Sequence, residues 1–427
     1  MANLVINGVA VLIFLTLVEA IVAEVNCQSE TTCGVCTNGQ SCSWCVRDEA
    51  CYAADTNNAP CSATMMKLQN ATCQQPKLTY DPIEGFFLLL MSSASYSNTP
   101  NVCFDKFNID LELVGTVDKR TQFDQRSFGF VAKSASQKVI LLSFRGTDEP
   151  FEFFIESMEA MFPVVAHAIG GRVSKYFSDA FDVLWPDIRS MVQQTLAQNP
   201  DYYIYVTGHS LGGAVAALAG VQLTYEKIIT PDRVKVVTQG QPRVGNSIFA
   251  TRYDAYVPNT WRIVHCRDPI PHLPFCGRVD NRKCYASLTD FSYHQGIEVF
   301  YEHKSMDIGT DLDYKICLGT PASEDTTCSF KMMTKPELIG VSLDWEALFK
   351  RPDEHELENM PVNSSPTDDH IFYFDTNVVA LGRASCSDDL MTQHDVNRLL
   401  TVATDYSKNS QNDLGSLHRL LASRSRK

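Results

Sequence analysis

The sequence predicts an α/β protein with a mostly parallel central sheet, preceded by a small disulfide-rich module. From residue 80 onward, short apolar runs alternate with helical stretches, a pattern typical of helices packed on a parallel sheet. The 15 cysteines are unevenly spread, with eight between residues 27 and 73 and seven over the rest of the chain. We therefore expect four segments, a leader at 1–23, the module at 24–75, the α/β domain at 76–390 and a polar tail at 391–427.

The composition narrows the class of protein. Apolar residues make up 44% of the 427 residues, which is enough to build a core and argues against a disordered chain. The 50 acidic and 36 basic side chains give a net charge of −14, which argues against binding nucleic acid through its phosphates. No convincing metal-ligand cluster stands out in the sequence, and we expect no metal and no organic cofactor.

A leader is predicted at the start of the chain. Residues 9–18 form an apolar run interrupted only by Thr16, which suits a signal peptide and is too short to cross a bilayer. Ala23 supplies a small residue for cleavage, but no positive charge precedes the run, so an uncleaved anchor is the alternative. Asn70 and Asn363 lie in glycosylation sequons. We expect a secreted or secretory-lumen protein with no transmembrane span after cleavage.

The cysteine-rich segment has too few apolar residues to fold around a core of its own, so cross-links must stabilise it. Its two Cys-x-x-Cys pairs are only five residues apart, which is too close for zinc knuckles and favours disulfides. The spacing C-x5-C-x2-C-x5-C-x2-C-x5-C, with Trp44 in CSWC, resembles the PSI (plexin–semaphorin–integrin) module. That resemblance implies a structural spacer without catalytic residues, through which the chain contacts other proteins.

A candidate nucleophile follows one of the predicted strands. Apolar runs typical of buried strands occupy residues 139–144, 202–206 and 234–237. The second run leads into a G-x-S-x-G pattern, Gly208 to Gly212, and an Ala-rich helical stretch follows. A serine at such a strand-to-helix turn exposes its hydroxyl, and the tight turn requires small neighbours. We therefore expect Ser210 to be a catalytic nucleophile.

A nucleophilic serine needs a base and an orienting acid, which in this arrangement follow it in the order Asp, then His. Asp268 comes after a predicted strand at 261–266 and is flanked by prolines, with an ordinary turn aspartate as the alternative. His370 follows a polar loop and precedes an apolar run, so we expect it on a flexible loop as the general base. His294 begins a strand-like run, which is typical of a structural histidine.

Six motifs resemble, in the same order, those of the class 3 (fungal-type) lipases, a family of α/β-hydrolases: SFRGT from Ser143, TGHSLGGA from Thr207, GQPRVGN from Gly240, RIVHCRDPIPHLP from Arg262, HQGIEV from His294 and DDHIFYF from Asp368. The resemblance covers most of residues 80–386. It implies an α/β-hydrolase fold with Ser210, Asp268 and His370 as the catalytic triad, and it makes His294 non-catalytic. It also implies the disulfides Cys103–Cys386 and Cys317–Cys328.

Acyl transfer also needs two N–H donors that stabilise the oxyanion. The residue after the nucleophile, Leu211, is the natural first donor. The turn Arg145-Gly146-Thr147 follows a predicted strand and is the source of the second. In the related lipases, the residue matching Thr147 gives this N–H, and an ordinary turn threonine is the alternative.

A short amphipathic helix is predicted directly after this turn, over residues 151–162. Its position matches the lid of the related lipases, which covers the serine and opens at a lipid surface. A surface helix docked on the core is the alternative. Glutamates lie on another face of the helix, and its apolar face consists of Phe151, Phe154, Ile155, Met158 and Phe162.

The remaining cysteines fit the same domain. Cys276 and Cys284 flank a short polar loop and form a reasonable third pair. Cys266, in the predicted strand before Asp268, is then left as a buried free thiol.

The sequence thus predicts a secreted serine hydrolase that cleaves carboxylic esters of lipids, with triacylglycerol lipase-like activity at a lipid–water interface. Two alternatives stay open. One is a phospholipase or an esterase that acts on soluble esters. The other is a catalytically inert binding protein that uses the cysteine-rich module.

Overall fold

The structure is a computed structural model, and it divides the chain into two compact units, residues 1–74 and 75–427. The predicted leader and tail, Asn70, Asn363 and most of the predicted lid lie outside the described residues. No helix among the described residues is both long and apolar enough to span a bilayer. The structure describes residues 27, 42–45, 50–53, 66–67, 80–107, 109–122, 124–147, 162–276, 284, 289–303, 306, 314–317, 324–332 and 366–387.

The first unit contains a small antiparallel sheet in the order β2-β1-β3. Its strands are β1 (Cys42–Cys45), β2 (Ala50–Ala53) and β3 (Met66–Lys67). Cys27 and Cys42 form a disulfide, Cys51 is also disulfide-bonded, and all three are buried together. Because zinc binds thiolates, these cysteines are not available as its ligands, in agreement with the disulfide interpretation of this segment.

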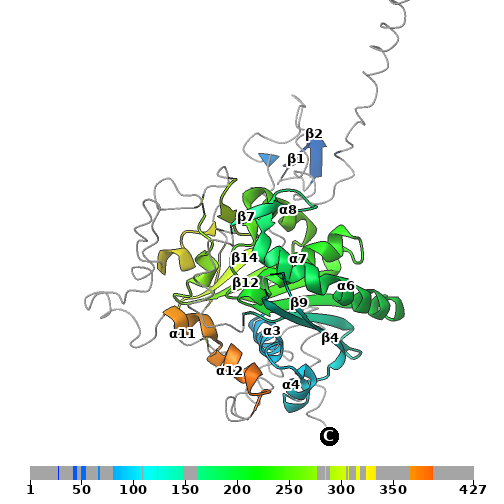
Figure 1. Cartoon of the computed structure of the whole chain (residues 1–427). Coiled ribbons are helices and arrows are strands. Elements are labelled where there is room, and N and C mark those ends of the chain that lie inside the picture. Colours follow the sequence, from blue (N-terminus) through cyan, green and yellow to red (C-terminus); the bar gives the residue numbers. More distant parts are fainter. Residues whose placement is uncertain are drawn as a thin grey trace, which may run out of the picture. The chain divides into compact units, whose positions relative to one another are not determined.

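The second unit is built on an eight-stranded sheet (Figure 1). Its five central strands, β6, β9, β10, β12 and β14, run parallel, and the outer strands pair antiparallel. The fold class is therefore the predicted one. In sheet order the strands are β15 (Lys315–Ile316), β14 (Ile297–Tyr301), β12 (Thr260–His265), β10 (Val234–Gln239), β9 (Tyr203–His209), β6 (Val139–Phe144), β5 (Arg126–Ser134) and β4 (Glu112–Arg120).

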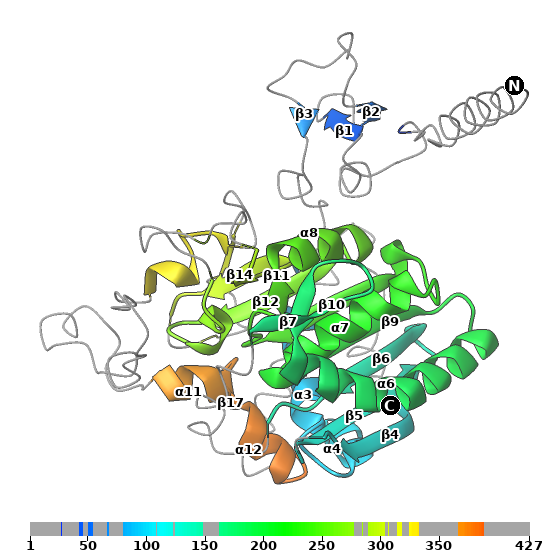
Figure 2. The ribbon, with the colours of Figure 1, turned by 45° about the horizontal axis from the view of Figure 1, so that its top comes forward.

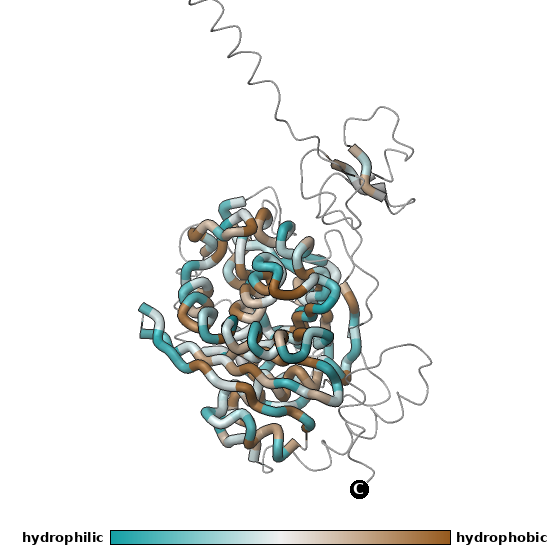
Figure 3. The backbone as a smooth tube through the Cα atoms, turned by 90° about the vertical axis from the view of Figure 1, so that its right-hand side faces the viewer, coloured by the Kyte–Doolittle hydropathy of each residue, from teal (hydrophilic) through white to brown (hydrophobic). Residues whose placement is uncertain are grey.

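The parallel strands are buried along almost their whole length because both faces of the sheet are covered. One face packs against α6 (Lys175–Gln198), α7 (Leu211–Tyr225) and α8 (Ser247–Tyr256). The other packs against α3 (Pro82–Ala94), α4 (Pro100–Lys106) and α12 (Val378–Arg383), so that the sheet lies between two helical layers (Figure 2). Brown and teal stretches alternate along the coils of the second unit (Figure 3), as expected of helices that bury one face.

Two central helices illustrate how the sequence specifies these layers. Asp81 caps α3, since its carboxylate accepts from the backbone N–H of Ile83 at 2.9 Å, and Pro82 occupies the first turn. All of α3 is buried. In α7, small residues such as Gly212, Ala214 and Gly220 let the helix backbone approach the sheet, and a Cβ on Gly220 would lie 2.6 Å from Val236 Cγ2.

Smaller elements complete the unit. A four-stranded antiparallel sheet runs in the order β13-β11-β8-β7, and a two-stranded hairpin follows α11. Their bounds are β7 (Pro163–Ala166), β8 (Arg172–Ser174), β11 (Gly245–Asn246), β13 (Ser292–Tyr293), α11 (Pro366–Ile371), β16 (Phe372–Tyr373) and β17 (Thr376–Asn377), with short 3-10 turns η5 (Pro231–Arg233), η6 (Ile270–His272) and η8 (Ser329–Met332).

The three cysteine pairs expected in the α/β domain are disulfide-bonded in the structure: Cys103–Cys386, Cys276–Cys284 and Cys317–Cys328. Cys266 is a buried free thiol in the described part of the chain. It lies just after β12 rather than within it, with φ of +42°, and burial raises the pKa of its thiol to about 12.

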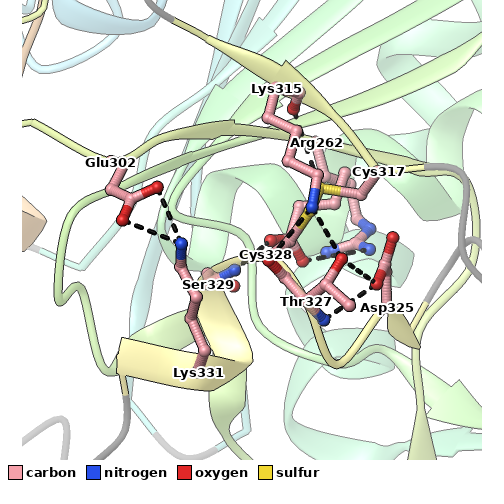
Figure 4. The surroundings of a disulfide bond; sticks show 10 residues. Arg262, Glu302, Lys315, Cys317, Asp325, Thr327, Cys328, Ser329 and Lys331 are labelled. Carbon is pink, nitrogen blue, oxygen red and sulfur yellow. Dashed lines mark hydrogen bonds and ion pairs between the residues drawn. A yellow bond between two sulfur atoms is a disulfide. The ribbon is translucent and has the colours of Figure 1, made fainter.

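Polar contacts connect the residues around the Cys317–Cys328 disulfide (Figure 4). Lys315 Nζ donates to Thr327 Oγ1 at 2.6 Å, and the backbone N–H of Thr327 donates to Asp325 Oδ1 at 2.9 Å. Together with the disulfide, these contacts fix residues 324–332 against the edge of the sheet.

The Cys103–Cys386 disulfide joins residues 283 positions apart, whereas Cys276 and Cys284 are eight apart. Replacing Cys103 and Cys386 with serine should lower the free energy of unfolding by about 2–5 kcal/mol, because the crosslink restricts the unfolded chain most when it closes a long loop. Urea unfolding under non-reducing conditions measures the loss. The matched Cys276 and Cys284 double variant should lose less, and an equal or greater loss in that control would contradict the argument.

Candidate active site

Ser210 lies at the turn between β9 and α7, in a strained backbone conformation with φ of 59° and ψ of −130°. Two glycines make the turn sterically feasible. A Cβ on Gly208 would lie 2.2 Å from the carbonyl oxygen of Gly212, and a Cβ on Gly212 would lie 2.1 Å from that of Phe144. The turn is held by the backbone N–H of Ser210, which donates to the carbonyl of Gln239 at 2.9 Å.

The fold brings Asp268 and His370 to this serine. His370 Nε2 is 2.9 Å from Ser210 Oγ, and His370 Nδ1 is 3.0 and 2.9 Å from the two carboxylate oxygens of Asp268. All three side chains are buried, with relative exposures of 2%, 3% and 0% in the order Ser210, His370, Asp268. The three residues predicted as a triad therefore form one continuous hydrogen-bonded chain.

The local setting of His370 differs from the sequence prediction. We expected a flexible loop, but His370 lies in the short helix α11 and is buried. The acidic residues before it belong to the first turn of this helix, where the helix dipole favours negative charge. One of them, Asp369, also accepts from the backbone N–H of Arg267 at 3.2 Å and pairs with the Arg267 side chain at 3.6 Å. These contacts dock the helix beside the Asp268 turn.

Asp268 has two further donors. The hydroxyl of Tyr373 donates to its Oδ2 at 2.5 Å, and the backbone N–H of Ile270 donates to its Oδ1 at 2.9 Å. Burial, and then the neighbouring Asp268 charge, raise the pKa of Tyr373 well above its usual value, so the phenol keeps its proton. Sequence analysis missed this role of Tyr373, although its place in DDHIFYF, three residues after His370, was visible.

His209 contacts the backbone of the predicted base, His370. The Tyr96 hydroxyl and His209 Nδ1 are 2.9 Å apart, and His209 Nε2 is 2.8 Å from the backbone carbonyl of His370. Burial, reinforced by the nearby His370, lowers the pKa of His209 well below its usual value. Neutral His209 therefore donates through Nε2 to the carbonyl and accepts the Tyr96 proton at Nδ1. This contact was also missed in the sequence.

A buried ion pair holds the segment that follows Asp268. Arg243 Nε and Nη2 donate to the two carboxylate oxygens of Glu324 at 2.7 and 2.9 Å, and Arg243 Nη1 donates to the Pro274 carbonyl at 3.1 Å. The backbone N–H of His294 also donates to Glu324, at 2.9 Å. His294 Nε2 is 2.5 Å from the Pro271 carbonyl, so this histidine is a buried structural residue, as expected.

The expected oxyanion donors lie beside the serine turn. Leu211 is the first residue of α7 and is buried, and half-buried Thr147 follows β6. The intervening Gly146 packs tightly, since a Cβ there would lie 2.1 Å from the Tyr96 hydroxyl and 2.8 Å from the His209 carbonyl. This close contact brings the loop that carries Thr147 against the strand that leads to Ser210.

Of the expected lid, the structure describes only the last residue, Phe162. Phe162 is half-buried, just before β7. The residues Phe151, Phe154, Ile155 and Met158 lie outside the described residues.

Comparison with known proteins identifies the family. The chain matches the family model of lipase (class 3) over residues 141–278. It is 31% identical over 264 residues to Lipase ZK262.3 of Caenorhabditis elegans, covering 58% of this chain and 73% of that relative. It is 38% identical over 147 residues to a lipase of Rhizopus niveus, covering 34% of this chain and 37% of that relative. The crystal structure of a lipase from Rhizopus microsporus var. chinensis aligns at 26% identity with a TM-score of 0.52, covering 73% of this chain and 91% of that one.

The fold is that of the α/β-hydrolases, with a serine, a histidine and an aspartate hydrogen-bonded at the carboxyl edge of the parallel sheet. The chain belongs to the class 3 lipase family and is a carboxylic ester hydrolase.

Gly240, which follows β10, limits the space around the Asp–His pair. Its φ is +57°, and a Cβ there would lie 2.8 Å from Asp268 Oδ2 and 3.0 Å from His370 Nδ1. The variant Gly240→Ala should therefore lower kcat/KM by about 100-fold, because a shift of the base by a fraction of an ångström disrupts the reacting geometry. Ester hydrolysis by the folded variant measures the effect.

Gly296 provides the matched control. It has φ of +69° and equally tight packing, with a Cβ that would lie 2.6 Å from Thr260 Cγ2, but it does not contact the triad. The variant Gly296→Ala should lose stability and keep its kcat/KM. Equal activity losses in the two variants would show that backbone strain, rather than contact with the base, causes the effect.

The donor from Tyr373 should matter for turnover. The variant Tyr373→Phe should lower kcat/KM about tenfold, since one hydrogen bond to a buried carboxylate is lost. In the control Tyr301→Phe, the lost bond is to Tyr80 at 3.2 Å, so stability should fall and kcat/KM should not. An unchanged kcat/KM in Tyr373→Phe would refute a positioning role for this hydroxyl.

Proposed function

We propose that this protein is a secreted serine lipase that hydrolyses the ester bonds of glycerolipids through an acyl-enzyme. The observation that carries the proposal is the chain of hydrogen bonds from Ser210 through His370 to Asp268, in which both contacts of the imidazole are 3.0 Å or shorter. Such a chain lets a neutral imidazole take the serine proton while a carboxylate holds the ring in the required tautomer.

Acylation follows from these contacts. Ser210 Oγ attacks the ester carbonyl carbon, and its proton passes to His370 Nε2. Asp268 accepts the Nδ1–H bond and stabilises the imidazolium. The negative charge on the carbonyl oxygen is stabilised by the backbone N–H groups of Leu211 and Thr147. Collapse of the intermediate then expels the alcohol, which takes the proton from Nε2.

Deacylation uses the same groups in reverse. A water molecule gives its proton to His370 Nε2 as it attacks the acyl carbon, and Ser210 Oγ leaves with that proton. Tyr373 and the backbone of Ile270 keep the Asp268 carboxylate in place through both half-reactions, because they occupy its other lone pairs. His209 holds the backbone of His370 through a hydrogen bond to its carbonyl.

The substrate class is supported by relatives and by the sequence. A Penicillium cyclopium relative is named a secreted mono- and diacylglycerol lipase and is 29% identical over 151 residues, covering 46% of that protein. A solved structure at 25% identity and a TM-score of 0.50 is described as a triacylglycerol lipase with a serine protease triad. The amphipathic pattern of residues 151–162 favours a lid that opens at a lipid–water interface.

The proposed location and domain organisation rest on separate features. The disulfides of both units favour an oxidising compartment. We propose cleavage of the leader after residue 23, glycosylation at Asn70 and Asn363, a PSI-like module at 24–75 that contacts other proteins, a catalytic domain at 76–390 and a polar tail at 391–427.

The nucleophile can be identified directly. An active-site phosphonate should label Ser210, mapped by mass spectrometry, and Ser210→Ala should lower kcat by about 10⁴-fold or more. An unfolding temperature of Ser210→Ala equal to that of the wild type serves as the control for folding. A phosphonate adduct on another residue, or wild-type turnover by Ser210→Ala, would refute Ser210 as the nucleophile. Absence of both labelling and ester turnover in the folded wild type would favour the catalytically inert binding protein.

Substrate preference is tested by comparing rates. Emulsified long-chain triacylglycerol should be hydrolysed faster than soluble short-chain esters, with a rise in rate where the substrate exceeds its solubility. Phosphatidylcholine vesicles form the third arm. A preference for soluble esters without that rise would make the protein an esterase, and a preference for the vesicles would make it a phospholipase.

A further inference from the structure

A cavity of about 470 Å³ is lined by Tyr96, whose hydroxyl bonds His209, and by three arginines. Arg126 begins β5, Arg145 follows β6, and Arg383 ends α12. The remaining described lining consists of the hydroxyl and amide side chains of residues 96–99 and of Ser385, and it includes no carboxylate. None of the three triad residues lines this cavity.

Two of these arginines are held in defined orientations. Arg126 donates through Nε and Nη2 to the Asp118 carboxylate at 2.9 and 2.5 Å, and Nη2 also donates to Asn98 at 3.1 Å. The guanidinium of Arg145 lies over the ring of Phe128, 4.6 Å from its centre, and Arg145 is only 4% exposed. Guanidinium groups fixed in this way lose little conformational entropy when they bind a ligand.

The described lining of the cavity includes three positively charged side chains, although the chain as a whole carries −14. The hydrogen bond from Arg126 lowers the pKa of Asp118 from its usual value, and the charges of Arg126, Arg145 and Arg120 add to the effect. Asp118 is thus a carboxylate held among several guanidinium groups. Arg126 and Arg145 meet at this end of β5 and β6, and Arg383 lines the same cavity.

We propose that this cavity binds a phosphate group, carried either by a soluble phosphate or by a lipid headgroup. Guanidinium groups match phosphate oxygens in pairs, and three of them arriving from three separate elements suit a tetrahedral anion better than a flat carboxylate with two oxygens. The volume exceeds that of a phosphate ion, so a phosphate ester also fits. The hydroxyl and amide side chains of residues 97–99 supply additional donors.

The bound anion would adjoin the catalytic machinery without occupying it. Tyr96 lines the cavity and also bonds His209, which holds the backbone of His370. Arg145 lies two residues before Thr147 in the loop proposed to bind the oxyanion. The cavity is therefore a second site, and its ligand does not compete for Ser210.

Titration calorimetry of the full chain with inorganic phosphate tests the site. Saturable binding is expected, and the variant Arg383→Gln should weaken it about tenfold through the loss of one charged donor. The exposed position of Arg383 makes this variant compatible with folding, and Arg126→Gln gives a second test. The control Arg120→Gln removes an exposed arginine that pairs with Asp124 outside the cavity, and it should bind as the wild type does. Equal weakening of phosphate binding in Arg383→Gln and Arg120→Gln would overturn the proposal.

A second arm distinguishes the source of the phosphate. In the Ser210→Ala background, which prevents hydrolysis, the chain is sedimented with phosphatidylcholine vesicles that contain or lack phosphatidic acid. Retention that depends on phosphatidic acid and is lost with Arg383→Gln assigns the site to a lipid headgroup. Calorimetric binding of inorganic phosphate without such retention assigns it to a soluble phosphate. Failure to bind in both arms refutes the site and leaves the proposed hydrolysis at Ser210 untouched.

Discussion

The close approach of three backbone segments around Ser210 is the constraint on which the rest of the site depends. The chain turns from β9 into α7 through one residue with positive φ, and this is feasible because Gly208 and Gly212 leave room for neighbouring carbonyls. The same contact presses α7 against the end of β6, where the loop with Gly146 and Thr147 begins. One steric requirement therefore positions both the nucleophile and the groups proposed to bind the oxyanion.

Around that turn, the parallel sheet gathers residues distant in sequence. The carboxyl ends of neighbouring parallel strands meet at one edge, so the turns after β9 and β12 deliver Ser210 and Asp268 to the same place. His370 arrives from a helix docked on this edge. Two buried groups with displaced pKa values keep the Asp–His pair in position. Protonated Tyr373 donates to Asp268, and neutral His209 donates to the backbone carbonyl of His370.

The sequence was sufficient to predict the fold class, the strand at 139–144 and the triad residues. Each of these depends on a local pattern: apolar runs, a glycine-flanked serine, an aspartate after a strand. The sequence did not predict that His370 lies in a helix, because α11 has six residues and is too short to show a helical period. Tyr96 and His209 are 113 residues apart, and their contact exists only once α3 has packed on the sheet. The arginine-lined cavity likewise draws its residues from separate elements.

The disulfide between Cys103 and Cys386 has a consequence for biosynthesis. Its first cysteine is translated 283 residues before its second, and the helix α12 that leads to Cys386 follows directly after the hairpin beyond His370. The base His370, the Asp268 donor Tyr373 and Arg383 all lie in this last stretch of the described chain. A ribosome-bound chain that ends before residue 370 therefore lacks the proton acceptor of Ser210, and ester hydrolysis is acquired only when the catalytic unit is almost completely synthesised.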